Sequence, residues 1–185
     1  TITVKQRFVA GDNADKPYMF RFGMRLQLPG SMNISTYYGR GPLENYSDRN
    51  HTTFVGKYKQ TTDEQFYSYI RPQENGNKTD IRWWLQTDNI GTGLAFFAPA
   101  ALSISALPYS QEELTDGIEK GQRHSEFLQK NGFTNMNIDG VQMGLGCVTS
   151  WGTWPLPQYL LPYADREYTF TMRPIKQQNS ASFNK

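Results

Sequence analysis

The sequence is poor in the residues that build disulfides and metal sites. Its 185 residues include one cysteine, Cys147, and two histidines. A single cysteine excludes an internal disulfide, and this set is too small for a zinc site with the usual ligand spacing. Cys147 also lacks a neighbouring Cys-His motif, so we interpret it as a buried structural thiol rather than a nucleophile. We predict no metal site and no cofactor in this chain.

Long hydrophobic runs and an excess of charge are also missing. No apolar run approaches the ~20 residues that cross a bilayer, and the start lacks the charged and apolar segments of a signal peptide. The 19 basic and 17 acidic residues leave a formal net charge of +2. The basic residues are scattered, whereas a nucleic-acid-binding protein normally clusters them on one face. The sequence therefore indicates neither a nucleic-acid nor a membrane partner.

Aromatic residues are plentiful, and the hydrophobic pattern alternates. Tyrosine, phenylalanine and tryptophan make up 14% of the chain, which favours β-structure. The clearest run is typical of a half-buried strand with one apolar and one polar face. Its apolar face comprises Phe20, Phe22, Met24, Leu26 and Leu28. Its other face comprises Arg21, Gly23, Arg25 and Gln27.

Further short strands and the turns between them follow from the same pattern. We predict strands over residues 3–9, 36–39, 66–70, 81–87, 94–98, 102–107, 136–143 and 167–172. Turns are predicted at Pro29-Gly30, Asn75-Gly76, Asn131-Gly132 and Asp139-Gly140, because Asn-Gly and Asp-Gly supply the positive φ of tight hairpins. Trp83 and Trp84 are consecutive within a strand, so they face opposite sides and at least one belongs to the core.

One segment has a helical pattern. Ser110 can cap it, Glu113 would complete a capping box, and Leu114 and Ile118 share a face. A second helical turn is predicted over residues 123–129. We predict a single all-β domain over residues 1–176, built of two packed antiparallel sheets with one or two short helices. A polar, disordered tail is expected over residues 177–185.

Glycoside hydrolysis needs two carboxylates beside the scissile bond, and the best candidates lie in one loop. Glu44 and Asp48 fall in a Gly/Pro-punctuated polar segment between strands, where functional residues often lie. Sequence spacing alone does not identify a catalytic pair. We favour the simpler interpretation, in which both side chains cap the backbone of their own loop and pair with Arg40 or Arg49.

A sugar epimerase would need histidines and a carboxylate that converge on a sugar ring. The sequence offers only His51, in a polar loop, and His124, in the second helical segment. Isolated histidines are more often structural, so the epimerase remains a lesser alternative.

The tryptophans in the loop SWGTWPLP are stronger candidates for a sugar site than the histidines or the carboxylates. Trp151 is followed by Gly152 and Trp154 by Pro155, and proline keeps this segment out of a central strand. Each indole can be a core plug or a flat surface against which a sugar stacks. The residues alone leave both roles open.

Several of these segments resemble one known family. Residues 38–49, YGRGPLENYSDR, resemble the G-x-G-P-x-E-N-Y-x-D-R signature of the C-terminal domain of the large β-galactosidases of glycoside hydrolase family 2. The turn PQENG at 72–76 resembles the P-x-E-N-G turn of that domain. NIDG at 137–140, MGLG at 143–146 and the Ser-Trp pair at 150–151 follow in the same order. The resemblance runs from about Thr1 to Met172.

The resemblance implies a galactose-mutarotase-like supersandwich that lends a residue to a catalytic site elsewhere. Catalytic glutamates and any Mg or Na ions are expected in a TIM barrel, which takes ~250 residues, so no catalytic residue is expected here. By resemblance, Trp151 forms an apolar platform for the aglycone of the galactoside. Trp154, His51 and Glu44 are secondary candidates. The parent enzyme is expected to be a homo-oligomer whose barrel domain lies in the same polypeptide.

One departure from the family bears on this role. The family carries Gly-Asp-Asp or Gly-Asp-Asn before Ser-Trp, whereas residues 147–149 here are Cys-Val-Thr. This loss of two polar side chains can alter the conformation of the loop or the substrate preference.

Because Thr1 falls within a strand pattern and is not preceded by methionine, we expect the sequence to be a fragment of a longer protein. We therefore predict no cellular compartment. The alternatives are a free-standing carbohydrate-binding module that uses Trp151 and Trp154, and an epimerase that uses His51.

Overall fold

The chain folds into antiparallel β-structure with two very short helices. The computed structural model describes residues 1–12, 15–115, 123–146, 149 and 152–176. Within them the strands are β1 (Ile2–Phe8), β2 (Arg21–Pro29), β3 (Ile34–Gly41), β4 (Phe54–Thr61), β5 (Lys78–Thr87), β6 (Gly93–Leu107), β7 (Phe133–Gln142) and β8 (Arg166–Ile175). The helices are α1 (Thr62–Gln65) and α2 (Gln111–Leu114), with 3₁₀ turns at Ser125–Phe127 and Pro157–Tyr159.

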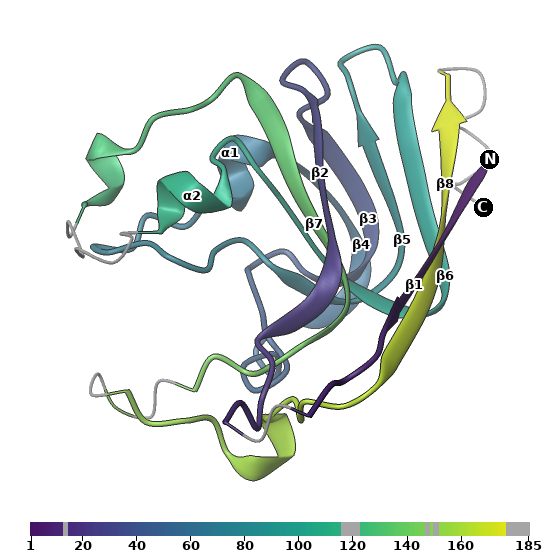
Figure 1. The fold of residues 1–185 in the computed structure, drawn as a ribbon. Helices are drawn as coiled ribbons and strands as arrows, with labels where there is room; N and C mark the ends of the chain where they lie inside the picture. Colours follow the sequence, from purple (N-terminus) through teal and green to yellow (C-terminus); the bar gives the residue numbers. More distant parts are fainter. Residues whose placement is uncertain (13–14, 116–122, 147–148, 150–151, 177–185) are drawn as a thin grey trace.

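A long strand, β6, connects two parts of the sheet. Its first residues, Gly93–Phe97, pair with β8, and its last residues, Ser103–Leu107, pair with β7. The main order is β1-β8-β6-β5-β3-β4, and β2 joins through β7. Figure 1 shows β2 and β7 lying in front of the layer formed by β3, β4 and β5. The two facing layers are therefore parts of one hydrogen-bonded, strongly curved sheet.

The hydrophobic core lies between these layers. Trp84 on β5 is fully buried and stacks on Tyr37 of β3 with ring centroids 4.6 Å apart. Its indole N–H donates to the Oε1 atom of Gln86 at 2.9 Å. Trp83 faces the other side of the sheet and is only partly buried, as its place beside Trp84 predicts. The core cluster consists of Leu28, Tyr37, Ile81, Trp84, Phe96, Leu102, Ile104, Ala106, Met136, Ile138 and Phe170.

Several predicted strand boundaries are wrong. Residues 66–70 are a loop, and the strand before them is β4 at the edge of the sheet, where exposed and partly buried residues alternate. The predicted strands 94–98 and 102–107 are two halves of β6. Pro99 does not separate them, because it lies where the β5 pairing shifts register between Trp83 and Ile81. Its missing N–H removes no ladder hydrogen bond there.

The pair Asp139-Gly140 does not form a turn but lies within β7. Asp139 pairs with Gly23 on β2 and with Ser103 on β6. A Cβ atom at Gly140 would lie 2.6 Å from the ring of Tyr168, so glycine serves close packing here and not a hairpin.

The predicted helix is present but short. Ser110 caps it by accepting a hydrogen bond from the Glu113 backbone N–H. The carboxylate of Glu113 instead accepts hydrogen bonds from Arg123 and from the Gln129 backbone N–H, so the predicted capping box is wrong. The second helical turn is confirmed in part, as the 3₁₀ turn Ser125–Phe127. Ile118 and the tail 177–185 lie outside the described residues.

The adjacent tryptophans provide a test of this core. Trp84→Ala should lower the free energy of unfolding by about 3–5 kcal/mol, because it leaves a cavity in a closed core. Trp83→Ala is the matched control and should cost clearly less, because its indole is on the partly open face. Denaturant unfolding of both variants measures the difference. Equal losses would contradict the assignment of Trp84 to the core.

Candidate functional site

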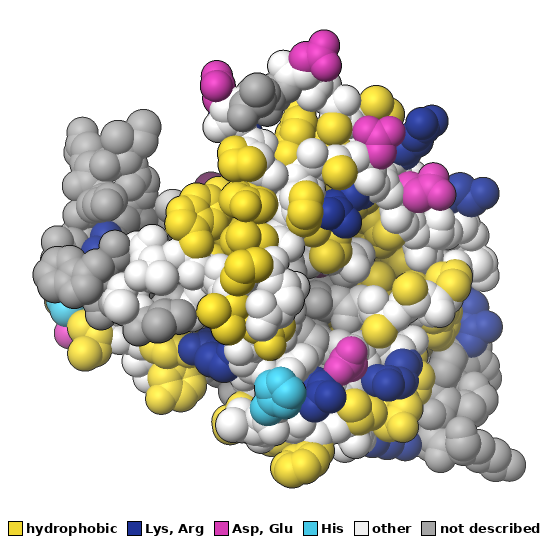
Figure 2. Space-filling model, turned by 90° about the horizontal axis from the view of Figure 1, so that it is seen from below, with side chains coloured by type: hydrophobic (Ala, Val, Ile, Leu, Met, Phe, Trp, Pro, Cys, Tyr) yellow, Lys and Arg dark blue, Asp and Glu magenta, His cyan; other side chains and the backbone are white. Residues whose placement is uncertain are grey.

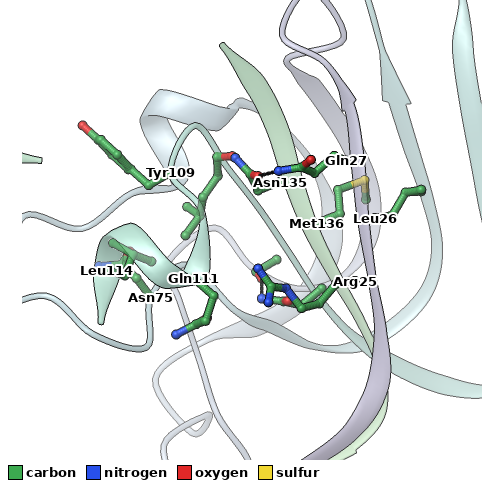
Figure 3. Close-up of a pocket in the computed structure, with 12 residues that line it drawn as sticks. Arg25, Leu26, Gln27, Asn75, Tyr109, Gln111, Leu114, Asn135 and Met136 are labelled. Atoms are coloured by element: carbon green, nitrogen blue, oxygen red, sulfur yellow. Dashed lines mark hydrogen bonds between the residues drawn. The ribbon is translucent and has the colours of Figure 1, made fainter. Parts of the chain in front are cut away.

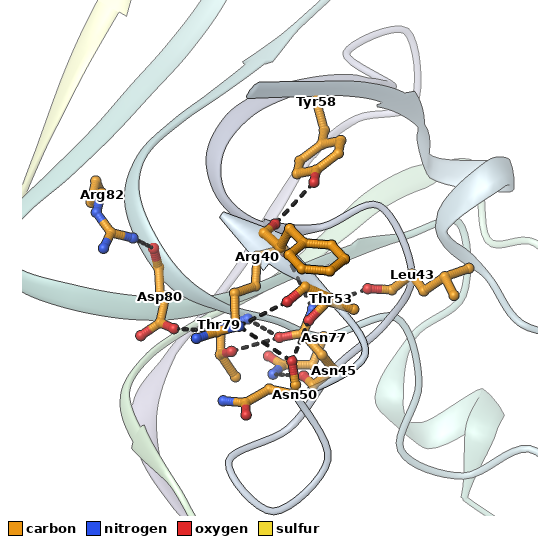
Figure 4. Close-up of polar contacts among 11 residues, drawn as sticks. Arg40, Leu43, Asn45, Asn50, Thr53, Tyr58, Asn77, Thr79, Asp80 and Arg82 are labelled. Carbon is orange, nitrogen blue, oxygen red and sulfur yellow. Dashed lines mark hydrogen bonds and ion pairs between the residues drawn. The ribbon is translucent and has the colours of Figure 1, made fainter. Parts of the chain in front are cut away.

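The loop between β3 and β4 is held in one conformation by the side chain of Asn45. This side chain is fully buried. Its Nδ2 group donates to the carbonyl oxygens of Arg40 and Leu43 at 3.2 and 3.0 Å. Its Oδ1 atom accepts from both the backbone N–H and the hydroxyl of Thr79. Figure 4 shows how these bonds tie the loop to the start of β5. All the hydrogen-bonding positions of the amide are used, so the loop is a rigid support.

Glu44 connects this loop to the PQENG turn. One carboxylate oxygen accepts from Arg49 at 2.8 Å and from the hydroxyl of Tyr69, and the other accepts from the backbone N–H of Gly76 at 2.8 Å. The Glu44 side chain is 7% exposed. The predicted pairing of Glu44 with Arg49 is confirmed, but the prediction that Glu44 caps its own loop is wrong, because its backbone partner is Gly76 in the PQENG turn. Its carboxylate is thus occupied in holding two segments together.

Asp48 has a different role from the one that the sequence suggests. Its two carboxylate oxygens accept hydrogen bonds from the backbone N–H groups of Leu145 and Gly146, at 3.1 and 2.7 Å. A Cβ atom at Gly144 would lie 2.6 Å from Cγ of Asp48, so glycine is required for this close approach. The prediction that Asp48 caps its own loop is wrong. It anchors the segment that follows β7.

The residues after this anchor include the predicted sugar contact. Trp151, Cys147 and Ser150 lie outside the described residues. The hydroxyl oxygens of Thr149 and Thr153, on either side of Trp151 in sequence, are 2.7 Å apart. Trp154 is 53% exposed, and its ring centroid lies 5.5 Å from that of Tyr18. The loop therefore carries at least one indole that is accessible to solvent.

A second cluster of charges, which the sequence analysis missed as a site, lies beside the same loop. Arg21 donates to Asp139 from Nε and Nη2, at 3.0 and 2.7 Å, and its Nη1 atom lies 3.1 Å from Glu74. Burial raises the pKa of Asp139 to about 6, although Arg21 opposes this shift. Burial likewise raises the pKa of Glu74. The sequence did contain a signal for this cluster, because Glu74 lies in the PQENG motif and Asp139 in the NIDG motif.

This cluster lines a cavity of about 370 Å³. Its other walls include Phe20, Gln111, Met143, Gly144 and Leu145. The cavity therefore extends from the Arg21 cluster to the segment that Asp48 anchors.

The histidines do not join either cluster. His51 and His124 are both exposed. Neither side chain forms a hydrogen bond or an ion pair with any residue that the structure describes. Among the described residues, no group of three or more His, Cys, Asp or Glu side chains could hold a metal ion, and no helix is long and apolar enough to cross a membrane.

Large hydrophobic side chains are exposed in the loops around these clusters. Leu43, Tyr67 and Ile70 lie in the segments that Glu44 connects, and all three are exposed. Figure 2, which views the molecule from below, shows hydrophobic side chains gathered in a band across this face. Such a band is typical of a surface that another protein part covers.

Comparison with known proteins identifies similar chains. The family model described as "Beta galactosidase small chain" matches residues 1–173. The chain is 36% identical over 161 residues to a beta-galactosidase of Priestia megaterium, 38% identical over 141 residues to one of Lactobacillus delbrueckii subsp. bulgaricus, and 34% identical over 160 residues to one of Vibrio cholerae. These matches cover 86%, 76% and 86% of this chain. They span only 15%, 13% and 14% of the respective relatives.

Asp139 gives this end of the chain a predictable pH dependence. Its pKa is about 6 in the folded chain and ~3.9 in an unfolded one, so the folded state binds the extra proton between these values. The contribution of Asp139 to stability is therefore lost as the pH rises from about 4 to about 6.

Over this range the wild type should lose on the order of 2 kcal/mol of unfolding free energy relative to Asp139→Asn. Denaturant unfolding across the same range is the measurement, and Asp12→Asn, at an exposed position, is the control for loss of one charge. A constant difference between wild type and Asp139→Asn would contradict the raised pKa.

Proposed function

The chain belongs to the β-galactosidase small-chain family, which confirms the resemblance seen in the sequence, and on this premise we propose that it is the non-catalytic, sugar-facing part of a β-galactosidase. The whole enzyme hydrolyses terminal β-galactosides through a covalent galactosyl intermediate. This chain contributes Trp151 as an apolar platform on the aglycone side of the substrate.

The observation that carries this proposal is the double hydrogen bond from Leu145 and Gly146 to Asp48. It joins two of the family motifs, YGRGPLENYSDR and MGLG, which are distant in sequence. The segment that begins at this anchor leads within a few residues to Trp151. We propose that this anchor helps to set where Trp151 meets the substrate, because preorganisation of a binding segment favours ligand binding.

The carboxylates near this loop support a non-catalytic role. Glu44 is bound by Arg49, Tyr69 and a backbone amide, and Asp48 is bound by two backbone amides. A glycosidase instead needs two carboxylates directed at one sugar. We place the acid/base and the nucleophile, with any Mg or Na ions, in a TIM barrel of the same polypeptide.

The exposed hydrophobic side chains of Leu43, Tyr67 and Ile70 suit docking against that barrel.

The edge of the sheet formed by β1 supports a further part of the proposal. Within the described residues β1 pairs only with β8, so its other edge is open to a further strand. We propose that such strands complete a galactose-mutarotase-like supersandwich and that the whole enzyme is a homo-oligomer.

A free-standing carbohydrate-binding module is the second candidate, and the exposure of Trp154 favours it. In such a module Trp151 and Trp154 would stack on a sugar without any catalytic partner. Trp151→Ala would then reduce galactose or lactose binding by the isolated chain. If the chain instead serves as the non-catalytic part of a β-galactosidase, the same substitution leaves the affinity of the isolated chain for these sugars unchanged. The epimerase would require His51 to act with a carboxylate, and polarimetry of fresh α-galactose with His51→Ala tests that function.

The isolated chain should not hydrolyse a chromogenic β-galactoside, whereas the enzyme assembled with its catalytic part should do so. In the assembled enzyme, Trp151→Ala should raise KM for lactose about tenfold, which corresponds to ~1.4 kcal/mol of lost stacking. Trp151→Phe, which keeps an aromatic ring, is the matched control and should recover part of this loss. Hydrolysis by the isolated chain would contradict the proposal.

Asp48 should act as a positioning residue for Trp151. In the assembled enzyme, Asp48→Ala should raise KM for lactose in the same direction as Trp151→Ala, and the double variant should be less than additive because both changes remove one interaction.

Asp88 offers a matched control, because its carboxylate also accepts two backbone N–H bonds, in the turn between β5 and β6. Asp88→Ala should therefore lower stability without changing KM. Full additivity of Asp48→Ala and Trp151→Ala would show that the anchor does not position the indole.

A further inference from the structure

A larger cavity lies on the outer face of β2, β7 and the end of β6, where α2 covers part of it. Its volume is about 410 Å³, within the range of small-molecule sites. Figure 3 shows Arg25 and Gln27 from β2, Asn135 from β7 and Gln111 from α2 around it. None of these residues takes part in the Asp48 or Arg21 clusters.

The polar lining follows from strand register. Arg25 pairs with Asn137, and Asn137 pairs with Ser105, across β2, β7 and β6. Gln27 and Asn135 form the next row on the same face, because side chains two residues apart point the same way. The apolar residues that alternate with them point into the core. The polar face of the alternating run at residues 20–28 therefore becomes one wall of a cavity.

The cavity contains hydrogen-bonding groups that have no partner within the described part of the chain. The Gln111 side-chain amide forms no hydrogen bond there, and Oε1 of Gln27 and Oδ1 of Asn137 accept none. Amides supply donors and acceptors together. Such groups match sugar hydroxyls, which also donate and accept.

The charge and the apolar surface of the cavity lining favour an uncharged ligand. The only charged residue in the lining, Arg25, is neutralised by Glu112 through two hydrogen bonds of 2.6 and 2.7 Å. A phosphate or carboxylate ligand therefore finds no free cation among the lining residues. Tyr109, which is only partly buried, supplies an aromatic face for the C–H groups of a sugar ring.

We infer that this cavity binds a neutral saccharide, namely the sugar units of an oligosaccharide substrate that lie beyond the terminal galactoside. This inference rests on the proposed function. Gln111 lines both this cavity and the cavity beside Met143, Gly144 and Leu145. A saccharide held beside Met143, Gly144 and Leu145 can therefore extend into the Gln111 cavity. The substrate class is then an oligosaccharide galactoside rather than a simple alkyl or aryl one.

Titration of the chain with β-1,4-galactobiose, followed by NMR of backbone amides, tests the inference. Signals of Gln27, Asn135 and Asn137 should shift, with a Kd in the millimolar range. Gln111→Ala should weaken binding about fivefold, the effect of losing one hydrogen bond of ~1 kcal/mol. This side chain has no partner in the described chain, so the variant should fold normally. Gln6→Ala on β1, outside the cavity lining, is the matched control and should bind as the wild type does.

The outcomes separate this inference from the proposed function. Shifts at the cavity that persist in Trp151→Ala support a second sugar site. No shifts, shifts unaffected by Gln111→Ala, or binding abolished by Trp151→Ala would each overturn it. The proposed function fails by a different result, namely an assembled enzyme whose KM is insensitive to Trp151→Ala.

Discussion

Two backbone amides that meet one carboxylate hold together the end of the molecule on which the proposed function depends. Leu145 and Gly146 donate to Asp48, and Asp48 itself lies in the loop that Asn45 keeps rigid. Without this anchor residues 143–146 would have to be ordered at each encounter with a ligand, at an entropic cost of ~1–2 kcal/mol per residue. The approach is possible because Gly144 has no Cβ.

Among the described residues, the core cluster around Trp84 consists of apolar and aromatic side chains, whereas the buried carboxylates lie at this end. Glu44 and Asp139 are both largely buried, and each accepts more than one hydrogen bond. Buried ion pairs contribute little net stability, because desolvation offsets their attraction. Their effect here is to fix the loop that carries Glu44 and the PQENG turn relative to β2 and β7. The apolar core around Trp84 supplies the stability that such an arrangement requires.

The same division explains which parts of the fold the sequence could predict. The strand that ends at Leu28 has strong apolar alternation, the strand around Trp84 is rich in large apolar residues, and both Leu28 and Trp84 are buried. The edge strand β4 was missed because Tyr58 is the only large apolar side chain among its partly buried positions, so its sequence shows little apolar alternation. The segment 66–70 has the alternation of a strand but forms a loop. There the side chain of Asn75 accepts a hydrogen bond from the backbone N–H of Tyr67 and donates one to its carbonyl oxygen.

The sequence by itself determined the antiparallel β class, the family and the inward and outward faces of the strands, because a two-residue period and a contiguous motif are local properties. It also limited the expected partners of Glu44 to Arg40 or Arg49 in the same loop, and the structure shows that Arg49 is the partner. Only the tertiary structure decided that Asp48 meets a loop 97 residues away. Only it brought Arg21 between Glu74 and Asp139. Such contacts depend on how the curved sheet returns upon itself, which no local pattern specifies.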